Sequence, residues 1–438
     1  MTALRAALAG AVERLREGDT DAAQTLLDGV LAEQPDQADA WHLRGVLFHQ
    51  RGDTVAAVQA IRHALTLLPR EHPVRAGMWN NLGNVLLESG ALEEAAVAYR
   101  ESLALAPEVS RTWTNLATLQ RRLGRLDEAA EAARAAVGAD PDDAEGWYAL
   151  ARALIEAGQV HDGLLAHSEA VTRWPRHDVG RDQVLRALVM LGRREEAAAL
   201  YREWLADDPG NAVALHQLAA CSDDLLAPPR ASDAYIETVF DSFADSFDAK
   251  LAGLGYRAPD LVAAAVKRAR PVPDAGLDVA DLGCGTGLCG PLLRPWARWL
   301  IGCDLSTGML EQAQRRAAYD ALFKVELVHF LEHEPASFDL LVCADTLCYF
   351  GDLGAFAAAA AGALRSGGLL VFTVEALIDG SDTPVRLLPS GRYAHSRAHL
   401  AEALAGGRWA GLSIEPDTLR QEAGLPVAGY VVSARRRA

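Results

Sequence analysis

A period of 34 residues runs through the first half of the chain and constrains its fold more than any other feature. Glycine, proline and tryptophan recur in step, with one four-residue insertion around residues 71–75. Glycine reverses the chain in a tight turn because it adopts left-handed backbone conformations without strain, and proline ends a helix. The pattern predicts about six helix–turn–helix units that end near residue 209. The recurring residues are Gly18, Gly52, Gly90, Gly124, Gly158 and Gly192; Pro35, Pro69, Pro107, Pro141, Pro175 and Pro209; and Trp41, Trp79, Trp113 and Trp147.

These units resemble the tetratricopeptide repeat. The unit with Trp113, Gly124, Ala129 and Pro141 matches the family pattern closely. The resemblance implies an α-solenoid with a concave groove, because one helix pair cannot bury its apolar face alone. We expect this domain to cover residues 1–227, with a capping helix in residues 211–226 and the four tryptophans as packing residues. A second domain is expected at residues 228–438.

A glycine-rich turn follows a predicted buried strand in the second half of the chain. The apolar run 277–282 leads into Gly283, Gly285 and Gly287, whose missing side chains allow a ligand to approach the backbone. Asp304 ends a second predicted strand, 17 residues after the third glycine, and its carboxylate can accept hydrogen bonds from two ribose hydroxyls. A dinucleotide-binding turn follows the pattern G-x-G-x-x-G, in which the third glycine would come one position later than Gly287. The spacing therefore favours a nucleotide-like cofactor without a pyrophosphate group.

Strands alternate with helices through the rest of this half, which predicts an open, mostly parallel sheet. Ser306 is the expected N-cap of the helix after the second strand. The last two apolar runs lie too close together to have a helix between them, so they are expected to form an antiparallel hairpin at one edge. The predicted strands are 277–282, 299–303, 324–328, 338–344, 369–375, 412–414 and 429–434.

The second half is similar to class I S-adenosylmethionine-dependent methyltransferases, through its motifs at residues 281–287 and 304–310. The whole chain is similar to a bacterial family that joins such a domain to tetratricopeptide repeats. The resemblance implies a Rossmann-like α/β domain with a seven-stranded, mostly parallel sheet, and S-adenosylmethionine as cofactor. The implied cofactor-binding residues are Asp281, Gly283, Cys284, Gly285, Gly287, Asp304, Leu305, Met309, Glu326, Leu327 and Tyr256.

The same resemblance implies roles for individual parts of the cofactor site. Glu326 accepts from the adenine amino group, and the N–H of Leu327 donates to the ring. Tyr256 and Arg257 close over the methionyl end. Residues 235–248 resemble the lead-in helix that closes over the cofactor in small-molecule methyltransferases.

Catalytic residues are harder to identify, because methyl transfer mainly requires alignment of the nucleophile, methyl group and sulfur. Asp345 follows the fourth strand and is expected either to contact the cofactor or acceptor or to cap a helix. His395 is the candidate general base because imidazole titrates near neutral pH, and the alternative is an ordinary loop histidine. The candidates for holding an anionic or peptide-like acceptor, against an ordinary surface role, are Arg386, Arg392 and Tyr393. Tyr349 is a further candidate for contact with the acceptor.

Two asparagines suggest what the repeats bind. Asn81 and Asn115 occupy equivalent positions in adjacent repeats. Amides both donate and accept, so stacked asparagines can bind an extended peptide backbone without reading its sequence. The arrangement resembles the asparagine ladder of protein O-glycosyltransferases. The alternative is that these amides are simply solvated polar groups in the groove.

Composition excludes several other classes. The net charge of −17 is not that of a nucleic-acid binder, and no apolar run is long enough for a membrane span. Residues 344–347 also lack the Pro-Pro-aromatic sequence of amino-directed DNA methyltransferases. The six cysteines form no C-x-x-C pair, so they indicate reduced core residues in a cytoplasmic protein and not metal ligands.

Three functions stay open at this point. The repeats capture a protein, peptide or carrier-bound acceptor for methylation, or the acceptor is a free small molecule and the repeats serve assembly. In the third possible function, the chain is a repeat scaffold whose methyltransferase-like domain binds cofactor without turnover.

Overall fold

The computed structural model describes residues 2–174, 180–222, 227–378 and 383–438. The chain forms two compact units, Met1–Leu191 and Gly192–Ala438. This division falls at the turn of the sixth helix pair, so its second helix belongs to the unit that contains the sheet. The domain boundary expected between residues 227 and 228 stays a prediction. No helix among the described residues is both long and apolar enough to cross a membrane.

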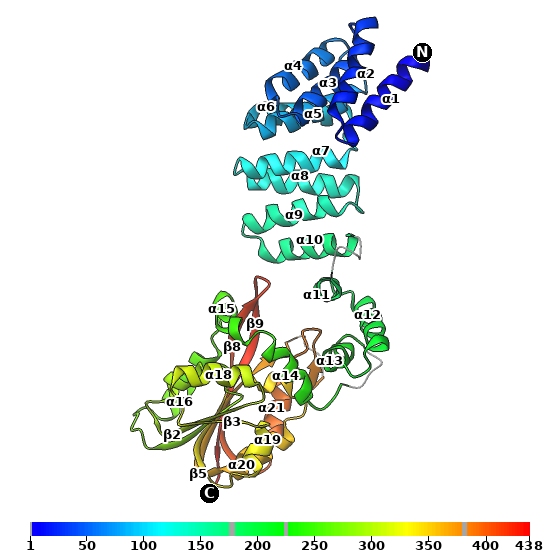
Figure 1. Cartoon of the computed structure of the whole chain (residues 1–438). Coiled ribbons are helices and arrows are strands. Elements are labelled where there is room, and N and C mark those ends of the chain that lie inside the picture. Colours follow the sequence, from blue (N-terminus) through cyan, green and yellow to red (C-terminus); the bar gives the residue numbers. More distant parts are fainter. Residues whose placement is uncertain (1, 175–179, 223–226, 379–382) are drawn as a thin grey trace. The chain divides into compact units, whose positions relative to one another are not determined.

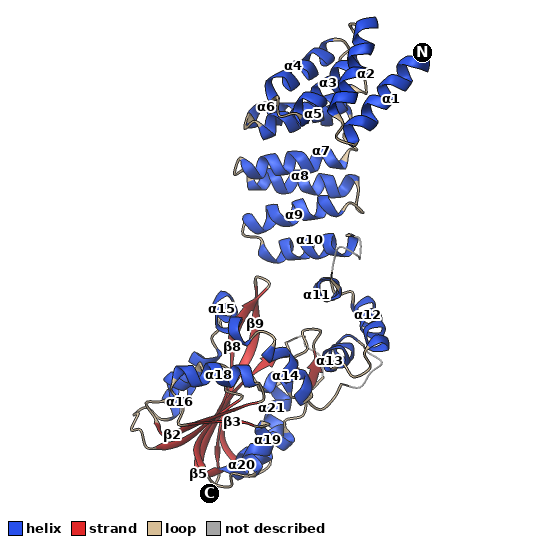
Figure 2. Cartoon of the chain, viewed as in Figure 1, coloured by secondary structure: helices blue, strands red, loops and turns tan. Residues whose placement is uncertain are grey.

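The first unit is a stack of antiparallel helix pairs, as the repeat pattern predicts (Figure 2). All six recurring glycines have φ between 69° and 80°, the left-handed region that a side chain disfavours. Each sits between the two helices of a pair, so the glycine period sets the helix boundaries. The helices are α1 (Thr2–Arg16), α2 (Thr20–Glu33), α3 (Ala38–Gln50), α4 (Thr54–Thr66), α5 (Arg75–Glu88), α6 (Leu92–Leu105), α7 (Ser110–Arg122), α8 (Leu126–Ala139), α9 (Ala144–Glu156), α10 (Val160–Arg173) and α11 (Arg181–Met190).

The recurring tryptophans link each repeat to the turn before it. The indole N–H of Trp41, Trp113 and Trp147 donates to the carbonyl oxygen of the proline six residues earlier, at 2.7–2.8 Å. In the repeat that carries the insertion, the guanidinium of Arg75 lies 5.9 Å from the Trp79 ring centre and donates to two backbone carbonyls. The rings also pack against the core of the stack, so tryptophan and proline recur together for a structural reason.

The second unit contains a mixed sheet with nine strands in its described part (Figure 1). Five parallel strands lie in the order β3-β2-β1-β4-β5, β9 pairs antiparallel with β5, and β8 pairs with β9. These strands correspond in number and order to the seven expected ones. The short hairpin β6–β7 is additional and pairs with the end of β5. The strands are β1 (Leu277–Leu282), β2 (Ala297–Asp304), β3 (Ala321–Lys324), β4 (Phe338–Cys343), β5 (Leu364–Ala376), β6 (Val385–Leu387), β7 (Tyr393–His395), β8 (Trp409–Glu422) and β9 (Leu425–Arg436).

Helices cover both faces of this sheet, and its strands alternate between two cores. Along β4, Leu340 and Val342 face one core, while Leu341 and Cys343 face the other. The first core is closed by α16 (Ala258–Ala269) and α17 (Cys289–Leu293), and the second by α19 (Leu327–Glu332), α20 (Gly354–Ala363) and α21 (Arg397–Ala403). Burial on both faces explains why these strands are almost continuously apolar.

Most predicted strand positions are close to the observed ones, but the third is wrong. β3 ends at Lys324, and the expected strand residues beyond it lead into α19. Glu326 starts this helix as its N-cap by accepting the backbone N–H of His329 at 2.8 Å. The predicted cap of α18 (Thr307–Arg316) is confirmed, because the Ser306 hydroxyl accepts from the N–H of Met309 at 3.1 Å. The terminal hairpin is also confirmed and is much longer than predicted.

Two helices in the repeat pattern belong to the second unit, α12 (Arg194–Asp207) and α13 (Ala212–Cys221). The His216 ring of α13 lies 4.0 Å from the ring of Tyr235, and its Nε2 donates to the carbonyl of Gly391 at 2.8 Å. Tyr235 belongs to α14 (Asp233–Asp241). The helix expected to cap the repeats therefore packs on the lead-in helix of the α/β fold. Residues 223–226 of the expected cap lie outside the described residues.

Candidate functional site

A cavity of about 270 Å³ opens at the carboxyl ends of β1, β2 and β4. Its other wall comes from α14 and from α15 (Phe247–Gly253), which belong to the expected lead-in segment. Of the eleven cofactor-binding residues expected from the sequence, the cavity is lined by Asp281, Gly283, Cys284, Gly285, Asp304, Leu305, Met309, Glu326, Leu327 and Tyr256. Gly287 does not line it.

Three glycines shape the turn after β1, two of them through close packing and one by leaving open space. Their φ angles are 66°, 53° and 84° for Gly283, Gly285 and Gly287. A Cβ on Gly283 would lie 2.3 Å from Cγ2 of Thr346, and one on Gly287 would lie 2.9 Å from the ring of Tyr319. The outer two glycines therefore permit close packing. A Cβ on Gly285 would meet no atom within 4 Å, so this glycine leaves open space toward the cavity.

Asp304 lies at the end of β2 and is held by two backbone donors. Its Oδ2 accepts from the N–H of Gly285, and its Oδ1 accepts from the N–H of Ser306, each at 2.9 Å. Burial raises the pKa of Asp304, and these hydrogen bonds oppose the shift. The carboxylate is thereby fixed against the glycine turn, with its remaining lone pairs available at the cavity.

Asp281 is almost fully buried beneath the same turn. Its Oδ2 accepts from the hydroxyl of Tyr319 at 2.6 Å. Burial raises the pKa of Asp281 to about 7, although the Tyr319 hydrogen bond acts in the opposite direction. This carboxyl group therefore changes its protonation state near neutral pH.

Glu326 provides an observation that fits an adenine-binding role. Its Oε2 is used to cap α19, while its Oε1 is buried and has no hydrogen-bond partner among the described residues. A buried oxygen without a donor is unfavourable by roughly 1–3 kcal/mol. An amino group that entered this end of the cavity would satisfy it.

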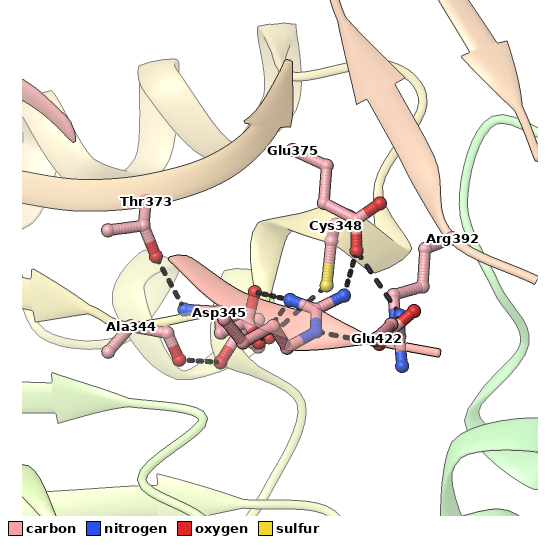
Figure 3. Close-up of polar contacts among 9 residues, drawn as sticks. Ala344, Asp345, Cys348, Thr373, Glu375, Arg392 and Glu422 are labelled. Atoms are coloured by element: carbon pink, nitrogen blue, oxygen red, sulfur yellow. Dashed lines mark hydrogen bonds and ion pairs between the residues drawn. The ribbon is translucent and has the colours of Figure 1, made fainter. Parts of the chain in front are cut away.

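A network of buried and partly buried charges surrounds Asp345 (Figure 3), and its members Asp345, Arg392 and Arg420 line the cavity. Arg420 reaches in from β8 and is only 2 % exposed. It donates to both carboxylate oxygens of Asp345 at 3.0 and 3.2 Å, to Glu422 at 2.7 Å, and to Glu375. Arg392 also contacts Glu422, at 2.7 Å, and Glu375, at 3.3 Å.

Asp345 occupies a constrained position in this network. Its φ of 55° is left-handed, and its N–H donates to the hydroxyl of Thr373 at 2.8 Å. The next residue, Thr346, donates to the carbonyl of Gly283 at 3.1 Å. Asp345 lines the cavity as expected, but its carboxylate pairs with Arg420 and does not cap a helix.

Tyr349, Arg392 and Tyr256 also line the cavity. Burial raises the pKa of both tyrosines, so they are neutral hydroxyls at physiological pH. Arg257 instead pairs with Asp417 at 2.6 Å on β8. Of the pair expected at the methionyl end, only Tyr256 therefore lines the cavity.

Three other candidates from the sequence do not line it. His395 is fully buried and stacks on His399 at 5.3 Å, and burial lowers its pKa to about 3. It is not placed to act as the expected general base. Tyr393 is buried and donates to the carbonyl of Pro228 at 2.5 Å. Arg386 is an exposed residue of β6. Sequence position alone could not show which face of this hairpin meets the cavity.

The asparagines of the repeats bond mainly to neighbouring side chains. Asn115 donates to the side-chain oxygens of Asn80 and Asn84, each at 3.0 Å. The amide of Asn81 lies 2.9 Å from Nε2 of His42, whose pKa burial lowers to about 4. These contacts occupy part of the hydrogen-bonding capacity that a peptide ladder would need. Peptide binding through Asn81 and Asn115 stays a prediction.

Several residues of the site were not identified from the sequence. Glu375 is an acid directly after the mainly apolar run 369–374 of β5, which is a detectable signal. Arg420 and Glu422 lie two residues apart on β8, and period-2 spacing places them on the same face. Nothing in the sequence indicates that this face meets Asp345.

The comparisons agree with these observations. A family model described as a methyltransferase domain matches residues 280–372. Two models described as tetratricopeptide repeats match residues 86–152 and 121–163, and residues 8–72 and 59–110. The chain thus carries tetratricopeptide repeats followed by a class I S-adenosylmethionine-dependent methyltransferase domain. This domain implies S-adenosylmethionine as cofactor, which the open space at Gly285 and the unpaired oxygen of Glu326 fit.

Individual relatives match only parts of the chain. Methyltransferase-like protein 27 of Homo sapiens is 42% identical over 84 residues, which are 19% of this chain and 34% of the relative. The ubiquinone biosynthesis O-methyltransferase of Xylella fastidiosa is 29% identical over 157 residues, 33% of this chain and 64% of the relative. An S-adenosylmethionine-dependent methyltransferase of known structure from Mesorhizobium loti is 26% identical, with a TM-score of 0.32, over 41% of this chain and all of that one. The chain thus spans between about a third and two thirds of the length of these curated relatives.

Proposed function

We propose that this chain transfers the methyl group of S-adenosylmethionine to an acceptor that its repeats bring to the methyltransferase domain. The acceptor would be a protein, a peptide or a group carried on a protein. The observation that supports methyl transfer most strongly is the continuous cavity. Asp304 and Glu326 line its cofactor end, and Asp345, Tyr349 and Arg392 line the other. The repeats support the delivery part of the proposal, because repeats of this kind bind other proteins.

The bound cofactor supplies a methyl group on a positively charged sulfur. The chain then has to hold the acceptor in line with that methyl group. Asp304 and the unpaired oxygen of Glu326 are suited to fix the cofactor through its ribose and adenine. Asp345 is suited to orient the acceptor, because two hydrogen bonds from Arg420 leave its carboxylate with free lone pairs.

Among the described residues that line the cavity, we assign none as a strong general base. Both carboxylate oxygens of Asp345 already accept hydrogen bonds from Arg420, at 3.2 and 3.0 Å, so this side chain is suited to orient an acceptor. The tyrosines of the cavity have raised pKa values and stay protonated. Asp345 therefore accepts a hydrogen bond from an acceptor O–H or N–H, and the proton leaves to water. Alignment supplies most of the catalysis in this scheme.

Calorimetry with the full chain tests the cofactor part of the proposal. S-adenosylmethionine and its homocysteine product are expected to bind the wild type. Asp304→Ala is expected to weaken that binding by roughly 2–4 kcal/mol, on the order of a hundredfold. Asp320→Ala is the matched control, since Asp320 also accepts a backbone N–H beside β2 but does not line the cavity. Equal losses in the two variants, or no binding by folded wild type, would refute the assignment.

Two truncations test delivery by the repeats. Residues 192–438 keep α13, which contacts the lead-in helix, while residues 228–438 lose it. If the repeats capture the acceptor, the 192–438 fragment keeps cofactor affinity but loses turnover of the acceptor. Unchanged turnover would favour a free small-molecule acceptor. Circular dichroism of both fragments separates loss of capture from loss of folding.

A further inference from the structure

Aromatic rings form one part of the cavity wall. Phe240, Phe243 and Phe247 line it from the lead-in segment, together with Tyr349. The ring of Phe240 lies 5.6 Å from Phe243, 6.0 Å from Phe247 and 5.6 Å from Tyr349. Each of these phenylalanines keeps part of its surface exposed. The chain therefore presents unburied aromatic surface inside the cavity.

Carboxylates on the same segment hold this aromatic wall against the fold. Asp241 accepts from the Ser306 hydroxyl at 2.5 Å and from the N–H of Gly308 at 3.1 Å. Asp248 accepts from the hydroxyl of Thr286 at 2.6 Å, in the turn between the glycines. Because these anchors lie on either side of Phe243 and Phe247, and Asp241 directly follows Phe240, the three phenylalanines form a built part of the site.

The polar end of the cavity carries an excess of negative charge. In the described part of the chain, Asp345, Glu375 and Glu422 pair with two guanidiniums, those of Arg392 and Arg420. All three nitrogens of Arg420 already donate to carboxylates. An anionic acceptor would place another negative charge beside this buried network, which is strongly unfavourable without a new cation.

The other cations on the cavity wall do not remove this excess. Arg230 pairs with Asp233 at 2.6 Å. Lys250 is exposed to solvent, and its Nζ lies 5.0 Å from the ring centre of Phe243. A solvated ammonium at the mouth interacts weakly with a charge at the buried end.

We propose that the group methylated in this cavity is uncharged, with an aromatic or aliphatic body and a hydroxyl or amine that donates to Asp345. This inference rests on the proposed function. It applies equally to a free molecule and to an apolar group carried on a protein, because both would present the same chemistry to the aromatic wall. It also replaces the anionic acceptor that Arg386, Arg392 and Tyr393 suggested in the sequence.

A matched pair of ligands tests the charge preference by binding. The full chain, with and without saturating S-adenosylhomocysteine, is titrated at neutral pH with 4-butylphenol and with 4-butylbenzoate. The phenol is expected to bind at least about tenfold more tightly. Equal affinity, tighter binding of the benzoate, or no binding of either would overturn the inference. Failure of S-adenosylhomocysteine itself to bind would instead count against the proposed function, while the comparison of the two ligands would still stand.

Point variants identify the groups responsible. Glu375→Gln removes the excess negative charge without changing side-chain shape, so the preference for the phenol should narrow about tenfold. Phe243→Ser should weaken both ligands, whereas Phe323→Ser, an exposed aromatic of β3 outside the cavity, should weaken neither. An unchanged preference in folded Glu375→Gln would refute the role of the charge network. Assaying turnover of the phenol by the full chain and by residues 192–438 then distinguishes a free acceptor from a carried one.

Discussion

The buried arginine of the terminal hairpin permits a quantitative test of how the cavity is held together. Arg420→Met keeps a long side chain on β8 but removes the guanidinium that faces Asp345, Glu375 and Glu422. Among the described residues, Glu375 and Glu422 would then keep their contacts with Arg392, while Asp345 would lose its ion pair. The variant should therefore destabilise the unit that contains the sheet and leave the repeats unaffected.

The size of the effect follows from burial. Removing one partner of a buried ion pair costs about 3–5 kcal/mol, because the remaining charges stay desolvated. For a domain of roughly 250 residues, 1 kcal/mol shifts the melting temperature by about 2–4 °C, so the predicted decrease is about 6–20 °C. Burial already raises the pKa of Glu375. Losing Arg420 would raise it further, so the deficit should shrink at acidic pH and grow as pH rises through the folded-state pKa.

The assay is thermal unfolding of the full chain at about pH 5 and pH 8, followed by near-UV circular dichroism. Arg268→Met is the matched control. Arg268 pairs at 2.7 Å with Glu415, which lies on β8 like Arg420, but this pair is exposed. Exposed pairs contribute about 0–1 kcal/mol, so the control should lose at most about 4 °C. If Arg420→Met has the same melting temperature as this control, or loses equal stability at both pH values, Arg420 does not stabilise the carboxylates by about 3–5 kcal/mol.

Three further predictions address other parts of the chain. Asp281→Asn removes a carboxyl group whose folded-state pKa is raised to about 7. Because of this raised pKa, the stability of the wild type falls as pH rises toward that value. In urea unfolding, the variant should therefore gain up to about 4 kcal/mol of stability relative to wild type between about pH 4 and pH 8. Parallel curves of unfolding free energy against pH for the variant and the wild type would contradict this expectation. Gly283→Ala should lose about 1–3 kcal/mol of stability because its Cβ would lie 2.3 Å from Thr346, whereas Gly285→Ala should lose less stability but bind S-adenosylmethionine about tenfold more weakly in calorimetry. Similar behaviour of the two variants would refute their different roles. Trp113→Phe should lower the unfolding free energy by about 1 kcal/mol, because it removes the indole hydrogen bond to the preceding turn. An unchanged urea midpoint would mean that packing alone explains this tryptophan.

Local patterns predicted the repeats and the cofactor end of the cavity. Gly18 and its five counterparts needed only their period to locate the turns, because left-handed backbone favours glycine wherever it occurs. The glycine turn and Asp304 were visible because a parallel strand, a turn and a second strand place them together at fixed spacing. The strand at 324–328 failed because an apolar run does not distinguish a strand from the start of a buried helix.

The charged end of the cavity, where we propose that the acceptor binds, depended on tertiary structure. Arg420, Glu375 and Asp345 come from three segments that are 30 or more residues apart, and no local pattern predicts that their side chains meet. His395 fulfilled a chemical criterion for a base, but the packing of β7 buried it. Likewise, α13 continued the repeat pattern but packs on the lead-in helix through His216.

The sequence by itself determined the two kinds of fold, the positions of the turns and the residues at the cofactor end. These depend on backbone conformation and on short-range spacing, which a linear pattern encodes directly. Only the tertiary structure decided which charged groups are buried together, which candidate residues line the cavity and which unit the last helices join. Those outcomes depend on side-chain contacts between distant segments, and on the burial that makes an unpaired charge costly.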